Sequence, residues 1–268
     1  MRPDVLVALL VVSGCAKPAA VPTPVPSPAA PAVSTPAPLV PVRGEGPPLP
    51  ASQTVLTRIA FGCCPEPDVD YPVLAAVSLL QPQLFVFVDR IDGSPEQRAE
   101  TYGQLNLNAQ FAAFNMATPI VASPGRAQQV DETAFERYWA TAAPGGDRPG
   151  VYGSRIFGLP GRRVQLIVLS PQPDPAETAW LESELQRPAE VRLVFGPKVD
   201  AVASAQGVTA RIFTTDAAYA GPLGASVPPL SGPDAGFGLI EIDWGREQLT
   251  LSLRDGSGQV LGSRVQTF

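Results

Sequence analysis

Short hydrophobic runs separated by turn-forming residues begin near residue 55 and continue to the end of the chain. Runs typical of buried strands cover residues 55–62, 84–89, 118–123, 162–170, 191–196 and 208–216. Three more runs, at residues 237–244, 247–255 and 259–265, are separated only by turns that contain Gly or Asp. The chain is therefore rich in strands, and its last three strands follow one another directly.

Helices are expected between the earlier strands. The stretch "SPEQ" at residues 94–97 is a capping box with proline at the first helical position, and the helix it opens is expected to reach Phe111 and Phe114. A second start signal is "DPAE" at residues 174–177, and residues 131–142 have amphipathic spacing. Alternating strands and helices followed by strands alone predict an α/β layered domain with a mixed sheet and an antiparallel C-terminal edge.

The first residues form a targeting segment. An apolar run from Val5 to Val12 follows Arg2 and is too short to cross a bilayer. The stretch "VVSGC" resembles a bacterial lipobox, which implies a signal peptide at residues 1–14 and lipidation of Cys15. The alternatives are a plain signal peptide and an apolar start without a targeting role. The lipid would anchor the protein in the bacterial cell envelope, at the outer membrane and facing the periplasm or the exterior.

Residues 15–52 are rich in Pro and Ala, which favours an extended spacer without helix or sheet. The folded domain is expected at residues 53–268. A ligand for a proline-binding module is a weaker interpretation of the same stretch, because nothing in the sequence points to such a partner.

Composition narrows the chemistry. The chain of 268 residues has no histidine and a formal net charge of -6. A nucleic-acid partner would require a basic face, so it is excluded as a class. The lack of imidazole removes Ser-His-Asp and Cys-His nucleophiles and all metal sites that need histidine.

Seven motifs, in this order, resemble the PhoD-like alkaline phosphatase/phosphodiesterase family of metallophosphatases. They are "RIAFGCC" (58–64), "LFVFVDRIDG" (84–93), "FERYW" (135–139), "GVYGSRIFG" (150–158), "RVQLIVLS" (163–170), "AWLESEL" (179–185) and "FGLIEIDW" (237–244). The resemblance implies a layered α/β/β/α sandwich with mixed sheets, and metal ions at the carboxyl ends of its central strands.

The resemblance also identifies residual metal positions. Cys64 matches the family's cysteine, Asp89 matches the acid of the second motif, and Asp216 matches a late acid. The other expected ligands are replaced: "SPGR" (123–126) stands where the family has Asp-Asp-His-Asp, Ala218 stands at a histidine position, and Ser170 stands at an acid. The family metals iron, calcium or zinc are therefore expected to bind weakly, or no cofactor is expected at all.

Two arginines could replace the missing cations. Arg90 follows Asp89, and Arg126 stands near the missing histidine, so their guanidinium groups could neutralise the remaining carboxylates and leave an anion-binding pocket. Ordinary surface arginines are the alternative. For the adjacent Cys63 and Cys64, buried free thiols and a disulfide between neighbours are both open.

The sequence thus predicts a membrane-anchored envelope lipoprotein whose phosphatase-type domain is a pseudoenzyme that acts by binding or structure. Its expected partners are the membrane and either another envelope protein or a phosphorylated small molecule. The alternative is an active metal-dependent phosphomonoesterase or phosphodiesterase with a reduced metal site, for which Asp131 and Glu132 are the only nearby additional acids. A third interpretation is a purely structural protein whose pocket is filled.

Overall fold

The computed structural model describes residues 46–67, 69–89, 94–124, 138–139, 152–170, 172–196, 207–213 and 224–268. The signal peptide, Cys15 and most of the spacer lie outside these residues, as do Arg90, Arg126 and Asp216. Of the helix expected at residues 131–142, only residues 138 and 139 are described.

A six-stranded sheet contains the two strands that carry Cys63 and Asp89. Its order is β11-β10-β9-β1-β2-β3. The strands are β1 (Arg58–Cys63), β2 (Leu84–Asp89), β3 (Ile120–Pro124), β9 (Gly236–Asp243), β10 (Gln248–Asp255) and β11 (Val260–Thr267). β1, β2 and β3 are parallel, whereas β9, β10 and β11 are antiparallel, so the expected C-terminal antiparallel edge is confirmed.

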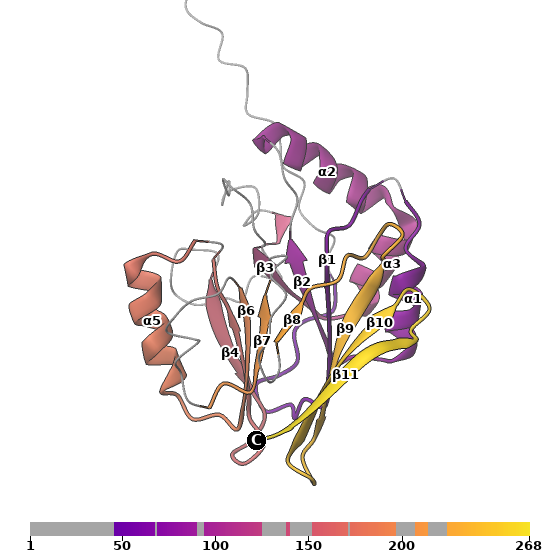
Figure 1. Ribbon diagram of the computed structural model, residues 1–268. Coiled ribbons are helices and arrows are strands. Elements are labelled where there is room, and N and C mark those ends of the chain that lie inside the picture. The colour runs from indigo at the N-terminus through magenta and orange to yellow at the C-terminus, as the bar shows by residue number, and fades with distance from the viewer. Residues whose placement is uncertain are drawn as a thin grey trace, which may run out of the picture. The chain divides into compact units, whose positions relative to one another are not determined.

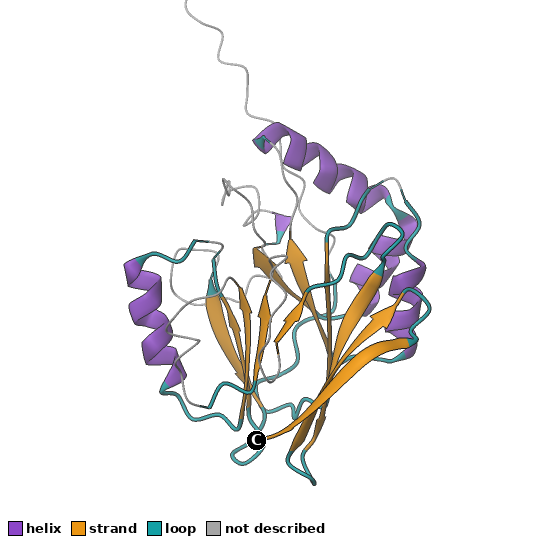
Figure 2. Ribbon diagram, viewed as in Figure 1, coloured by secondary structure: helices purple, strands orange, loops and turns teal. Residues whose placement is uncertain are grey.

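A five-stranded sheet has the order β4-β5-β6-β7-β8. Its strands are β4 (Gly153–Phe157), β5 (Val164–Val168), β6 (Val191–Gly196), β7 (Ala210–Phe213) and β8 (Gly224–Ser226). Only β4 runs antiparallel to its neighbour, and the other strands are parallel. In Figure 2 these parallel strands and strands β2 and β3 point toward the same side. The carboxyl ends of both sets therefore lie at one end of the domain.

Three buried clusters define the layers. One cluster fills the space between the sheets, with side chains from β1, β2, β9 and β10 on one side and from β4 to β7 on the other. A second cluster joins the opposite face of the six-stranded sheet to three helices, and a third joins the five-stranded sheet to one helix. The result is a four-layer α/β/β/α sandwich with two mixed sheets, as expected (Figure 1).

The helices begin where the local sequence supports them. They are α1 (Pro72–Leu79), α2 (Pro95–Leu107), α3 (Ala109–Ala117) and α5 (Pro175–Leu185). The capping box of α2 is formed by Ser94 and Gln97 as expected. The helix does not continue to Phe114, because Asn108 ends α2 and its side chain caps α3 by accepting from two backbone N–H groups. Within the described residues, no helix is long and apolar enough to cross a membrane.

The end of the expected spacer contacts the domain. Leu49 packs against the cluster between the sheets, and the backbone N–H of Gly158 donates to the carbonyl of Ser52 at 2.7 Å. Burial of Leu49 and this backbone hydrogen bond fix the chain just before it enters β1.

One contact shows how tightly neighbouring strands of the six-stranded sheet are packed. Gly238 of β9 lies opposite Phe61 of β1, and a Cβ atom at Gly238 would stand 1.9 Å from the Phe61 ring. We expect Gly238→Ala to lower the free energy of unfolding by roughly 1–3 kcal/mol, because the ring has to move within a filled core. Urea unfolding followed by circular dichroism measures this loss.

Gly103 provides the matched control. It lies in α2, and a Cβ atom there would have no neighbour within 4 Å. Gly103→Ala should leave stability unchanged or raise it by up to about 1 kcal/mol, because alanine is the better helix former. Equal stability of the Gly238→Ala variant and the wild type would contradict this account of the core.

Candidate functional site

The candidate site lies at the carboxyl ends of β1 and β2. These strands are parallel neighbours, with Cys63 opposite Val88, so Cys64 and Asp89 are the next residues at the same edge of the sheet. Their side chains nevertheless have different surroundings. Cys64 packs against the cluster between the two sheets. Asp89 contacts residues of the cluster on the helix side of the sheet.

The carboxylate of Asp89 is buried and is bound by two protein donors. Its Oδ2 atom accepts a hydrogen bond of 2.5 Å from the Tyr102 hydroxyl and one of 2.8 Å from Nε1 of Trp139. Tyr102 comes from α2, which the Ser94 cap positions after β2. Asp89 is 6 % exposed and both donors are almost fully buried. A buried carboxylate needs such partners, since an unpaired charge is expensive to remove from water.

Stacked aromatic rings hold the two donors in place. Tyr102 stacks on Tyr138 with ring centroids 4.1 Å apart, and Tyr138 donates to the Asn106 side chain at 3.0 Å. Trp139 packs on Phe87 of β2 at 4.7 Å. Trp139 therefore does more than fill the core. It also satisfies the Asp89 carboxylate.

The electrostatics of this cluster favour a neutral phenol. Burial first, and then the charge of Asp89 and its hydrogen bond, raise the pKa of Tyr102 far above its ordinary value. The positive charge of Arg98 acts in the opposite direction. Arg98 is itself buried on α2, so a described arginine provides positive charge close to Asp89 and Tyr102.

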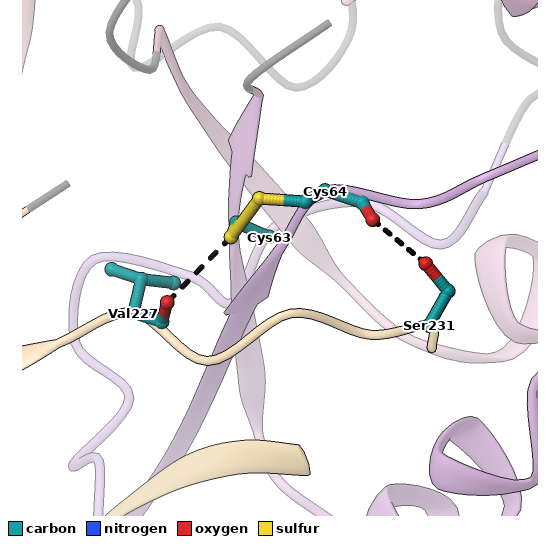
Figure 3. Close-up of a disulfide and its surroundings, with 4 residues drawn as sticks. All are labelled: Cys63, Cys64, Val227 and Ser231. Carbon is teal, nitrogen blue, oxygen red and sulfur yellow. Dashed lines mark hydrogen bonds between the residues drawn. A yellow bond between two sulfur atoms is a disulfide. The ribbon is translucent and has the colours of Figure 1, made fainter. Parts of the chain in front are cut away.

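Cys64 is engaged in a disulfide with its neighbour Cys63 (Figure 3). Cys63 is buried at the end of β1, and its Sγ atom lies 3.6 Å from the carbonyl oxygen of Val227. Cys64 has a positive φ of 60°, and its carbonyl accepts from the Ser231 hydroxyl at 3.0 Å. The disulfide is one of the two forms that the sequence left open. Metals bind the thiolate, so the oxidised Cys64 offers no such ligand.

Ser170, which stands at an expected acid position, is bound to a carboxylate instead. Its backbone N–H donates to Oε1 of Glu177 at 2.8 Å, and its hydroxyl donates to Oε2 of the same side chain. The side chain of Asp174 caps α5 by accepting from the N–H of Glu177 at 2.7 Å. The "DPAE" start signal is thus correct for Asp174, but the Glu177 side chain links α5 to the end of β5.

The described residues contain no group of three or more Cys, Asp or Glu side chains that could hold a metal ion. A site that joins Cys64, Asp89 and Asp216 stays a prediction, because Asp216 lies outside the described part of the chain. The same holds for the anion-binding role of Arg90 and Arg126. With Cys64 and Asp89 alone, metal binding would require reduction of the disulfide and release of the carboxylate from its two donors.

A separate groove lies between α1 and α3. It has a volume of about 380 Å³ and contains neither Asp89 nor Cys64. Its lining is Tyr71, Pro72, Leu74, Ala75, Ser78, Gln110, Ala113, Phe114 and Ala117. None of these side chains carries a charge, so this groove lacks the groups that phosphoryl chemistry requires.

No protein-family model matches the chain, and no curated protein matches its sequence. Solved structures with a similar course of the chain include Vps29 of Chaetomium thermophilum, at 15% identity and a TM-score of 0.33 over 79% of this chain and 98% of that chain. A single mutant of Vps29 from Entamoeba histolytica gives 13% identity and a TM-score of 0.30 over 79% and 99%. The function of this chain therefore has to follow from its own residues.

Tyr102 should remain protonated in alkaline solution for as long as the protein is folded. Its pKa is raised in the folded state, so above about pH 10 the unfolded chain loses the phenol proton and the folded protein keeps it. The contribution of Tyr102 to stability is complete below that pH and falls as pH rises, by about 1.4 kcal/mol per pH unit.

Chemical denaturation between pH 9 and 11, compared with Tyr102→Phe, measures this slope. The free energy of unfolding of the variant should fall less steeply above pH 10 than that of the wild type, because the variant lacks this phenol. Tyrosinate absorbance in the folded wild type should show at least one tyrosine that ionises only on unfolding. Ionisation of every tyrosine near pH 10 in the folded protein would contradict the prediction.

Removal of the Asp89 carboxylate should destabilise the fold. Asp89→Ala leaves the Tyr102 hydroxyl and the Trp139 N–H buried without their acceptor, which should cost roughly 2–5 kcal/mol in unfolding free energy. Asp89→Asn retains an acceptor oxygen and should cost less. Glu100→Ala, on the exposed side of α2, is the control and should change stability by less than about 0.5 kcal/mol. If Asp89→Ala were as stable as this control, the carboxylate would have no role in the fold.

Proposed function

We propose that this protein is an envelope lipoprotein whose PhoD-like, metallophosphatase-type domain is catalytically degenerate and acts by binding or structure. The observation that supports the proposal best is the state of Asp89. Its Oδ2 atom, at a former metal position by resemblance, accepts hydrogen bonds from Tyr102 and Trp139.

Two neutral donors, with the positive charge of Arg98 close by, do for Asp89 what a cation does in a metal site. A carboxylate that ligates a metal directs its lone pairs at the ion, whereas here two protons of the protein occupy Oδ2. The donors are fixed by ring stacking and by burial, so a metal would have to displace a preorganised arrangement. We therefore propose that the site needs no metal ion for its stability.

The other residues of the chain do not readily provide the ligands that two-metal hydrolysis requires. A two-metal hydrolase needs carboxylates and imidazoles that hold its ions a few ångströms apart and generate a hydroxide nucleophile. The chain has no histidine, and the Cys64 thiol is bound in a disulfide. Ser170 offers a hydroxyl in place of the family's acid, and that hydroxyl is bonded to Glu177.

The proposed location follows from the sequence. The lipobox-like "VVSGC" and the spacer of residues 15–52 would hold the domain at a distance from the membrane. A binding role at the outer membrane, toward another envelope protein or a phosphorylated small molecule, fits an anchored domain without its own turnover.

Metal content and hydrolysis test the proposal together. We expect the purified full chain to contain less than about one tenth of a metal ion per molecule, since the carboxylate at the strand end is already satisfied. It should not hydrolyse phosphomonoesters or phosphodiesters with added calcium, iron or zinc, with or without reductant. Elemental analysis and a chromogenic phosphoester assay measure these two quantities.

Asp89→Asn identifies the source of any activity that is found. Turnover in the wild type that disappears in this variant, or stoichiometric iron, calcium or zinc, would establish the alternative: an active phosphoesterase with a reduced metal site. Activity that is equal in both proteins would come from a contaminant. The reductant arm matters because only reduced Cys64 could supply a thiolate ligand.

A further inference from the structure

The outermost strand of the six-stranded sheet is unusually open. Among the described strands, β11 pairs with β10 on one side and forms the end of the sheet on the other (Figure 1). Seven of its eight residues are exposed. Among them are three apolar side chains, Val260 at 45 %, Leu261 at 70 % and Val265 at 60 % exposure. A long edge strand of this kind presents unpaired backbone groups that another strand can bind.

The backbone groups that face away from β10 can be identified. The N–H of Phe268 donates to the carbonyl of Glu247, and the register then alternates from Phe268 to Gly262, beyond which it shifts between Leu253 and Arg254 of β10. Because hydrogen-bonded and non-hydrogen-bonded positions alternate, Ser263, Val265 and Thr267 direct their backbone N–H and C=O groups outward. These are the positions at which a further strand would form hydrogen bonds.

The side chains of β11 carry almost none of the usual protection against pairing. The strand contains no proline and no lysine, and Arg264 is its one charged residue. Ser263 and Val265 lie opposite Ser252 and Thr250 of β10, so they share the face of the sheet to which the helices bind. Arg264 lies on the opposite face, where it is exposed to solvent.

We propose that β11 pairs antiparallel with β11 of a second copy of this chain, about a two-fold axis at Ser263. This register places Leu261 of each copy opposite Val265 of the other. It also places Arg264 opposite Gly262, so that the arginines do not face each other. The pairing joins the two six-stranded sheets into one continuous sheet and buries the exposed apolar residues of both edges.

Neighbouring registers are less favourable. A shift of the axis to Arg264 uses the same outward backbone groups but puts two arginines directly opposite each other, which is destabilising. A shift to Val265 shortens the paired segment, because β11 ends at Thr267. Self-complementarity in a single register is what a symmetric interface requires, and it favours a second copy over an unrelated strand.

Sedimentation velocity of the full chain tests the pairing, with Cys15→Ser in every variant so that no lipid drives association. We expect the chain to sediment at tens of micromolar as a dimer, with twice the 28.1 kDa mass of one chain. Ser263→Lys and Ser263→Glu should each weaken association at least tenfold, because like charges would meet at the two-fold axis. An equimolar mixture of the two variants should form dimers again, since lysine then faces glutamate.

Thr267→Lys is the matched control, because it adds the same charge to the same strand. In the proposed register residue 267 lies opposite the uncharged Gln259, so this variant should dimerise like the wild type. Unchanged urea midpoints would show that all variants fold, as expected for substitutions at exposed positions. The proposal would be overturned if the wild type were monomeric or if Ser263→Lys dimerised as strongly as the wild type. It would also be overturned if the mixture of the two variants stayed monomeric. A monomeric chain that binds a foreign strand peptide at β11 would also overturn it in favour of a different partner.

Discussion

The carboxylate of Asp89 has to be satisfied inside the protein, because β2 carries it to a position that water does not reach. Tyr102 and Trp139 meet this requirement, and they come from segments 13 and 50 residues away along the chain. One oxygen atom thus links α2 and residues 138–139 to the end of β2, in addition to their apolar packing on the sheet. A metal ion would satisfy the same carboxylate but would impose no such position on these segments.

The end of β1 is closed in a comparable way by protein groups. The segment 227–231 runs beside it, with the N–H of Cys63 bound to the carbonyl of Pro228 and the N–H of Leu230 bound to the carbonyl of Cys63. Leu230 fills the space next to Gly62, where a Cβ atom would stand 2.6 Å from its Cδ2 atom. The two strand ends where metals are expected by resemblance are therefore packed and hydrogen-bonded. This packing is consistent with the proposed loss of catalysis.

Structure that depends on neighbouring residues could be predicted well from the sequence. Contacts between distant segments could not. The Ser94 cap and the three C-terminal strands could be read directly from neighbouring residues. Helix α1 was missed because its sequence is almost uniformly apolar and its N-terminus has no side-chain cap. The sequence also could not predict on which face of the sheet Asp89 lies. All the remaining residues of β2 are apolar, so no alternation of polar and apolar residues shows which face meets the helices. Trp139 as a donor could not be foreseen, since only the fold brings it to Asp89.

A binding role then needs a surface other than the ancestral metal position. The strand ends of β1 and β2 offer packed side chains, and the groove between α1 and α3 offers no charge. The two edges of the six-stranded sheet differ sharply: the side chains of residues 120–123 in β3 are buried, while seven of the eight residues of β11 are exposed. An edge strand supplies backbone hydrogen bonds in a fixed direction without any catalytic group. If the strand ends of β1 and β2 are a former catalytic position, as proposed, recognition is best served by this edge.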